Sequence, residues 1–201
     1  MSKAIFVSDS HGCKKYLRYA ISLAKERGAD NIFHCGDIGH NILKWFAEET
    51  DDLGVYLVRG NHDRMKKLRR ISNKYDHVNL LRNTTIEFDE TYIVSKGLPY
   101  SMHMGKRYKR TLDQLLGEVS AKPRVLLFTH YNDLKGLKTK GILNIHGHKH
   151  INKWWMYVIK GKYCRLDKLM NYYHKDTTYS HNVALRVLMV DFEDLSTEWL
   201  L

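Results

Sequence analysis

The sequence predicts an α/β fold, and three features of the 201-residue chain indicate it. Short apolar runs recur between turn residues, as in strands buried on both faces. A helical pattern lies between the first two runs, so that strand and helix alternate through the first half of the chain. Such alternation is typical of parallel strands joined by helical crossovers.

Six apolar runs are expected to form strands. They are AIFV at 4–7, NIFHC at 31–35, VYLV at 55–58, TYIV at 91–94, VLLF at 125–128 and GILNI at 141–145. The segments TTIEF and TYIV flank Asp89 and Glu90 as the arms of a hairpin would. Near the end of the chain, VALRVLMVDF at 183–192 is expected to be one long strand.

Two helices are expected between the first three runs. Leu17, Ile21 and Ala24 fall on one helical face, and Gly28 is placed to end that helix. Residues 41–49 form the second candidate. The chain has only two prolines and no proline-rich linker, so we expect a single domain over residues 1–201 with an excursion at about 153–182.

The formal net charge is +11 and the sequence pI is near 9.5, which favours a polyanionic partner such as nucleic acid. The alternative is a solvated, lysine-rich surface. The three cysteines, Cys13, Cys35 and Cys164, are too scattered for a disulfide framework and favour a reducing compartment. No apolar run approaches the roughly 18 residues of a membrane span. We therefore expect a cytoplasmic protein that does not associate with membranes.

Polar motifs follow five of the expected strands. Asp9 and His11 follow the first, Asp37 and His40 the second, Asn61 and His62 the third, His130 the VLLF run, and His146, His148 and His150 the GILNI run. The carboxyl ends of strands in an open parallel sheet share one edge, where ligands bind. We therefore expect these side chains to meet in one cleft.

The ordered series D-x-H, G-D, G-N-H-D, a lone His and G-H-x-H resembles the calcineurin-like metallophosphoesterase superfamily. The resemblance covers residues 4 to about 150, and HNV at 181–183 is also similar. It implies an α/β/β/α sandwich of two mixed sheets flanked by helices.

The resemblance also implies seven ligands for two divalent ions. Two such ions, roughly 3.5 to 4 Å apart, can hold a phosphate ester and lower the pKa of a bridging water. Asp37 would bridge them, with manganese expected and iron, zinc, cobalt or nickel as alternatives. One ion would be held by Asp9, His11 and His150, and the other by Asn61, His130 and His148.

His62 is similar to the family histidine that contacts the phosphate and assists the leaving group. We favour His40 over Asp63 as its orienting partner. Phosphoprotein phosphatases of this superfamily have an aspartate at the position of His40, whereas its double-strand-break repair nucleases have a histidine there. The alternative for His40 is a surface histidine that begins the next helix. We expect His34, Cys35 and His146 to be packed inside the fold and not to be ligands.

Three basic clusters bear on the substrate: residues 64–70, 105–110 and 153–175. The last interleaves cations with Trp154, Trp155 and several tyrosines, as single-stranded nucleic acid would require, although a satellite core would explain these rings equally well. The expected function is a phosphodiesterase that acts on nucleic acid or a nucleotide through a metal-bridging hydroxide. One alternative is a small-molecule phosphomonoesterase or nucleotide pyrophosphatase. A second is a non-catalytic scaffold of the same fold, although the presence of His62 and of every metal position argues against a scaffold.

Overall fold

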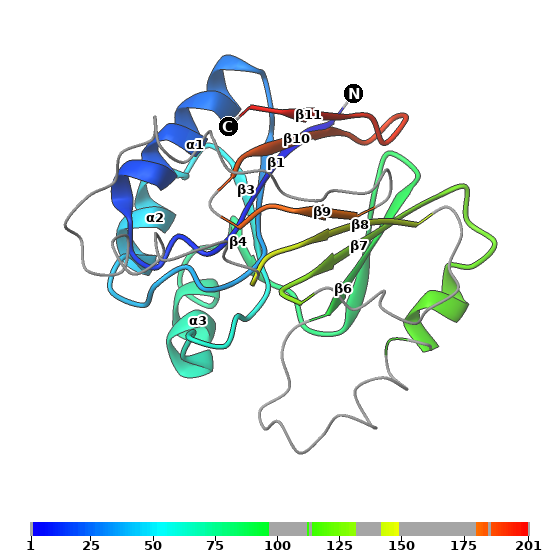
Figure 1. Ribbon diagram of the computed structural model, residues 1–201. Helices are drawn as coiled ribbons and strands as arrows, with labels where there is room; N and C mark the ends of the chain where they lie inside the picture. Colours follow the sequence, from blue (N-terminus) through cyan, green and yellow to red (C-terminus); the bar gives the residue numbers. More distant parts are fainter. Residues whose placement is uncertain are drawn as a thin grey trace.

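The computed structural model describes residues 2–96, 112, 114–131, 142–148, 180–184 and 186–200, which form two β-sheets (Figure 1). The first sheet has the strand order β11-β10-β1-β2-β3-β4. Strands β1 to β4 are parallel, whereas β10 and β11 are antiparallel to their neighbours. The bounds are β1 Lys3–Val7, β2 Asn31–His34, β3 Gly54–Leu57, β4 Val78–Leu80, β10 Leu188–Asp191 and β11 Thr197–Trp199.

The second sheet has the strand order β5-β6-β7-β8-β9. Strand β5 is antiparallel to β6, and the remaining pairs are parallel, so this sheet is mixed as well. The bounds are β5 Thr84–Phe88, β6 Thr91–Lys96, β7 Arg124–Thr129, β8 Ile142–His146 and β9 Ser180–Asn182.

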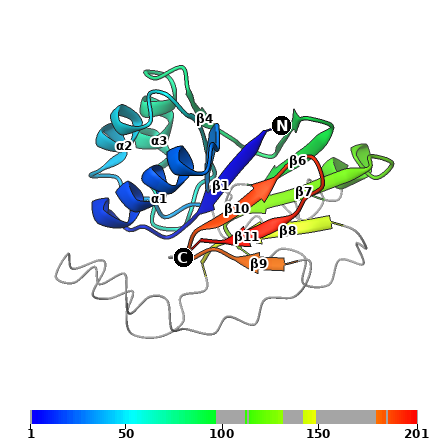
Figure 2. The same cartoon turned by 90° about the horizontal axis from the view of Figure 1, so that it is seen from above.

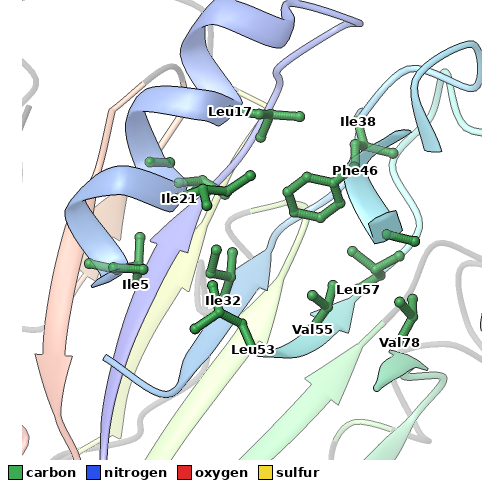
Figure 3. Close-up of a cluster of buried hydrophobic side chains, with 14 of the residues drawn as sticks. Ile5, Leu17, Ile21, Ile32, Ile38, Phe46, Leu53, Val55, Leu57 and Val78 are labelled. Atoms are coloured by element: carbon green, nitrogen blue, oxygen red, sulfur yellow. The ribbon is translucent and has the colours of Figure 1, made fainter. Parts of the chain in front are cut away.

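Helices α1 (Lys14–Glu26), α2 (Leu43–Glu49) and α3 (Met65–Ser72) cover the outer face of the first sheet (Figure 2). Figure 3 shows the apolar cluster between them, in which Leu17 and Ile21 of α1 and Phe46 of α2 lie against strand residues. On the outer face of the second sheet, a short helical segment at residues 114–118 packs through Leu116. The expected α/β/β/α sandwich is confirmed.

The apolar runs are continuous because the strands of the first sheet are buried on both faces. In β1, Ile5 and Val7 belong to the cluster beneath the helices, whereas Ala4 and Phe6 belong to the cluster between the sheets. In β2, Phe33 stacks on Phe6 with ring centroids 4.7 Å apart. Alternate side chains therefore fill two separate cores, which is why no polar alternation marks these strands.

All six expected runs form strands, and the hairpin between β5 and β6 is confirmed. Its two turn residues, Asp89 and Glu90, have φ values of 43° and 63°, as a two-residue hairpin turn with left-handed backbone requires. The first helix is also confirmed, with Gly28 at φ +65° after its end. The second begins at Leu43, two residues later than expected.

The expectation of one long strand at 183–192 is wrong. Residues 180–182 form β9 in the second sheet, and the chain then crosses to the first sheet, where β10 begins at Leu188. Val183 is buried between the sheets and Val187 beneath the helices, so the apolar run serves two cores. An apolar run without alternation does not reveal where within it a strand begins.

The expected excursion at 153–182 therefore overlaps the second sheet at its end, because residues 180–182 form β9. Its basic and aromatic part, residues 153–175, lies outside the described residues, as does the basic cluster at 105–110. Within the described ranges, no helix has the length and apolarity needed to cross a membrane. The division of the chain into one domain stays a prediction.

Candidate active site

The loops after five strands meet at one place, but these strands belong to two sheets and not to the single sheet that sequence reasoning assumed. Strands β1, β2 and β3 lie in the first sheet, and β7 and β8 in the second. Asp9, Asp37 and His130 are all buried and offer ligand atoms that lie within 4.8 Å of one another. Both sheets therefore contribute polar side chains to one buried cluster.

The backbone of this cluster is strained. Asp9, His11, Asp37 and His148 have φ values of 57°, 44°, 57° and 68°, in the left-handed region that residues other than glycine rarely adopt. Hydrogen bonds between loops hold this conformation: the N–H of Asp9 donates to the carbonyl of Gly36, and that of His11 donates to the carbonyl of Asp37, both at 2.9 Å. These hydrogen bonds thus stabilise an unfavourable backbone conformation that brings the four side chains together.

Asp37 lies at the centre of the cluster. Its Oδ1 accepts a hydrogen bond of 2.8 Å from the N–H of His62. In the described part of the chain, its buried Oδ2 has no hydrogen-bond partner. This Oδ2 lies 4.0 Å from Nε2 of His11, 4.0 Å from Nε2 of His62 and 3.6 Å from Nε2 of His130.

Burial raises the pKa of Asp37 from 3.8 to about 8, and the nearby carboxylates of Asp63 and Asp9 add to the rise. The ionised carboxylate is therefore unstable in this cluster unless a positive charge compensates it. A divalent cation between Asp37 Oδ2 and the surrounding imidazoles would supply that charge. The residues present fit the bridging role that the sequence predicts for Asp37.

A second group of donor atoms surrounds Asn61. Its Oδ1 lies 2.9 Å from Nε2 of His130 and 3.0 Å from Nδ1 of His148. Nδ1 of His130 lies 2.8 Å from the carbonyl of Cys35 and must donate to it, so Nε2 of a neutral His130 has only a lone pair. With the amide oxygen on this side, two acceptors lie 2.9 Å apart, and a proton or a metal cation bound by both would stabilise them. This geometry fits the predicted grouping of Asn61, His130 and His148 around one ion.

The other predicted ligand group is described in part. Nε2 of His11 lies 3.9 Å from Oδ1 of Asp9. The opposite oxygen of Asp9, Oδ2, accepts hydrogen bonds from Oγ of Ser8 at 2.5 Å and from the N–H of His148 at 2.9 Å. The Asp9 carboxylate is therefore oriented with Oδ1 on the His11 side. The third predicted ligand, His150, lies outside the described residues.

Two glycines in the motifs allow the loops to approach closely. A Cβ added to Gly147 would lie 2.0 Å from Oγ of Ser8 and 2.4 Å from Oδ2 of Asp9. A Cβ added to Gly60 would lie 2.1 Å from Oδ1 of Asp37. Glycine is therefore required at both positions if His148 and Asn61 are to reach the carboxylates.

Asp63 has a role that sequence reasoning missed. Its buried Oδ2 accepts hydrogen bonds from the N–H groups of Asp37 at 2.7 Å and Gly60 at 3.0 Å. It therefore links the loop after β2 to the loop after β3, whereas sequence reasoning considered it only as a partner for His62. The signal was present, since an acidic residue that ends a buried turn is well placed to accept backbone N–H groups.

His34 is buried beneath the site, as expected, and burial lowers its pKa to about 3. The ring is therefore neutral, and its Nδ1 accepts a hydrogen bond of 3.2 Å from the N–H of Gly36. Its Nε2 then donates to Oγ of Ser10 at 3.0 Å, and this hydroxyl donates to the carbonyl of Ile38 at 2.9 Å. His34 and Ser10 thus brace the loop that carries Asp37.

Other expectations for the core also agree with the structure, since Cys35 and His146 are buried. Tyr131 was overlooked in the T-H-Y motif. Its ring centroid lies 4.0 Å from that of His148 and 5.1 Å from that of His130. The tyrosine ring restricts the orientation of both imidazoles.

The structure shows no contact between the two predicted catalytic histidines within its described residues. His62 lies at the mouth of the site, with a side chain that is 60% exposed and a ring 5.4 Å from that of His11. His40 is exposed and lines a hollow between α2 and α3. No hydrogen bond, ion pair or ring contact joins the two among the residues described.

The chain belongs to the calcineurin-like phosphoesterase superfamily, whose domain matches residues 2–157. No curated protein matches the sequence. Similar structures include TT1561 of Thermus thermophilus, which is 14% identical with a TM-score of 0.60, and the alignment covers 98% of this chain and 97% of that one.

An archaeal phosphodiesterase is 14% identical with a TM-score of 0.54, and 98% of each chain is covered. Yfce, a phosphoesterase from E. coli, is 13% identical with a TM-score of 0.50, and 97% of this chain and 96% of that chain are covered. At these identities the likeness concerns the fold. Family membership supports a phosphoester hydrolase that binds metal ions.

Proposed function

We propose that this protein is a dimetal phosphodiesterase that acts on nucleic acid or a nucleotide. The observation that supports it most strongly is the buried Oδ2 of Asp37, which has no hydrogen bond within the described residues and lies within 4.0 Å of three imidazole nitrogens. A carboxylate in this environment is stabilised by cations on two sides, as a bridging ligand would be.

In this proposal the ions would supply Lewis acidity and an activated water nucleophile. Asp37 would bridge them, and manganese is the metal proposed from the family resemblance, although mixed nitrogen and oxygen donors also accept iron, zinc or cobalt. The remaining ligands would be Asp9, His11 and His150 for one ion and Asn61, His130 and His148 for the other.

His62 is the proposed acid of the reaction. Its backbone is tied to Asp37 by the 2.8 Å hydrogen bond to Oδ1, while its exposed ring remains open to a substrate. A protonated imidazole there can donate a hydrogen bond to a phosphate oxygen or a proton to the departing alkoxide. His40 stays a predicted orienting residue, and the hydrogen bond that ties His62 to Asp37 makes His62 the better candidate for contact with the substrate.

The basic charge of the chain supports a polyanionic substrate over a small monoester. A cytoplasmic location is proposed because the three cysteines of the chain are too few and too scattered for a disulfide framework.

The test is a comparison of two chromogenic substrates, a phosphodiester and a phosphomonoester with the same leaving group. Purified protein would be stripped of metal, reloaded with manganese or zinc, and assayed on both. We expect metal-dependent hydrolysis with a higher kcat/KM for the diester. A higher value for the monoester would favour the phosphomonoesterase alternative, and metal binding without hydrolysis of either would favour a scaffold. A panel of single- and double-stranded DNA, RNA and cyclic nucleotides would then define the substrate.

A further inference from the structure

A hollow of about 310 Å³ is lined by residues of α2 and α3 and of the segments next to them. These two helices lie on the helical side of the first sheet (Figure 2). Four cations line the hollow: Lys44 from α2, Lys67 and Arg70 from α3, and Lys74 just beyond α3. Among the described residues, no acidic side chain lines it. The hollow therefore gathers positive charge from two elements on a concave surface, which focuses the electrostatic field.

Most of this charge is not compensated by the protein. Lys44 lies 3.5 Å from Glu48 in an exposed pair, and Nζ of Lys74 lies 5.0 Å from the ring of Tyr75. Lys67 and Arg70 form no ion pair in the ranges that the structure describes. They are also neighbours on the helix surface, because they are three residues apart in α3. Like charges at this spacing destabilise a helix.

The position of one cation also opposes a helix dipole. Lys67 is in the first turn of α3, and this turn contains no acidic residue. Cations near a helix N-terminus are unfavourable, whereas an anion there is favourable. Lys67 therefore lowers the stability of α3, and a bound anion would relieve this effect.

The hollow adjoins the loops of the metal cluster. His40 and Asn41, which line it, follow Asp37 in the loop between β2 and α2. A Cβ added to Gly12 would lie 3.0 Å from Oδ1 of Asn41, so Asn41 contacts the loop that carries His11. On the other side, α3 begins three residues after His62.

We propose that this hollow binds backbone phosphates of a single-stranded nucleic acid whose reacting phosphate lies at the metal cluster. The proposal rests on the proposed phosphodiesterase function and extends it to a polymeric substrate. A mononucleotide would place its phosphate at the metals, and the four cations of the hollow would then have no phosphate to bind. A nucleic-acid strand carries a negative charge on each further phosphate along its backbone. A hollow of about 310 Å³ has room for phosphate groups of one strand.

The test compares two double variants of α3. Lys67→Gln/Arg70→Gln removes two cations that line the hollow. Lys66→Gln/Arg69→Gln is the matched control, because it removes two exposed cations from the same helix that do not line the hollow. The probe is a short, fluorescent oligothymidylate with phosphorothioate linkages, which resist hydrolysis, so that the metal-loaded protein can be used. Fluorescence anisotropy gives the Kd at a series of salt concentrations.

We expect the log–log salt slope of the Lys67/Arg70 variant to be shallower than that of the wild type by about 0.7 for each phosphate that is no longer neutralised, or about 1.4 for two phosphates. The Lys66/Arg69 control should keep the wild-type slope. Equal changes in both variants would overturn the proposal in favour of a general surface charge. An unchanged slope in the Lys67/Arg70 variant would overturn it directly.

Circular dichroism would establish that each variant is folded. If the double variant does not fold, the single variants Lys67→Gln and Arg70→Gln would replace it, and each is expected to show half the change in salt slope. Binding to anionic vesicles is the competing arm: if the Lys67/Arg70 variant loses vesicle binding and keeps oligonucleotide binding, a membrane is the partner and the proposal is wrong. Hydrolysis of the small diester by the wild type tests the proposed function separately. If the wild type hydrolyses the diester but the salt slopes of the variants are unaltered, only the proposed role of the hollow is contradicted. If the salt slope changes in the Lys67/Arg70 variant but the wild type does not hydrolyse the diester, only the proposed phosphodiesterase function is contradicted.

Discussion

The backbone N–H of Asp37 donates a hydrogen bond of 2.7 Å to Oδ2 of Asp63, 26 residues further along the chain. The same oxygen accepts from the N–H of Gly60 at 3.0 Å. The buried carboxylate thus fixes the loop after β2 against the loop after β3. Because its charge also raises the pKa of Asp37, Asp63 increases the need of Asp37 for a compensating cation.

Asp63→Ala should destabilise the protein because it leaves two backbone N–H groups in a buried site without an acceptor. An unsatisfied buried donor costs about 1–3 kcal/mol, and urea unfolding of the metal-free protein would measure the loss. Asp63→Asn is the control, since one side-chain oxygen can still accept both bonds, and it should lose less. Equal stabilities for the two variants would show that these hydrogen bonds do not hold the loops.

Asp37→Asn should weaken both metal sites together, because a bridging carboxylate contributes charge to each ion. Elemental analysis after reloading should show the loss of more than one ion per chain relative to the wild type. His11→Ala, which removes a predicted ligand of one ion only, is the comparison. Two ions per chain in the Asp37→Asn protein would reject the bridging role.

His62→Ala should keep its metal content and lose turnover, because the exposed ring of His62 is placed to act on the substrate. General acid and base groups typically contribute about 10²- to 10⁴-fold to the rate. If His62 protonates the leaving group, the loss should be smaller for a diester with a good leaving group than for one with a poor leaving group. The same loss for both would point to positioning of the phosphate as its main role.

The metal-free protein should become less stable as the pH rises through the neutral range. The pKa of Asp37 is about 8 in the folded chain against 3.8 as a model group, so the folded state binds an extra proton between these values. The free energy of unfolding therefore falls as the pH rises from about 4 to about 8, and the loss is complete above that range. Asp63, whose pKa is also raised by burial, acts in the same direction.

Urea unfolding with a chelator at several pH values would measure this dependence, and Asp37→Asn should flatten it. Saturating metal should reverse the trend, since metal binding needs the ionised carboxylate and stabilises the fold more as the pH rises. A metal-free wild type whose stability rises through the neutral range would contradict the buried, proton-binding state of Asp37.

The sequence alone determined strands β1, β2, β3, β6, β7 and β8, the β5–β6 hairpin, α1 and the chemical types of the site residues. These features depend on local patterns: an apolar run for a strand buried on both faces, Asp89 and Glu90 for a tight turn, Gly28 for a helix end. The polar motifs could be placed at strand ends for the same reason. The sandwich architecture, in contrast, followed from the family resemblance and not from these patterns.

Contacts between distant parts of the chain determined the rest. Val183 and Val187 are equally apolar, so only the packing of two sheets shows that they fill different cores. The sequence analysis missed helix α3 because this helix, all of which the structure describes, buries only Met65 and Leu68. Most of its other residues are cations, so no apolar helical face marks it in the sequence. The bonds of Asp63 and the hollow between α2 and α3 depend on how separate loops and helices pack, and that arrangement arises from burial over the whole fold, which no short stretch of sequence encodes.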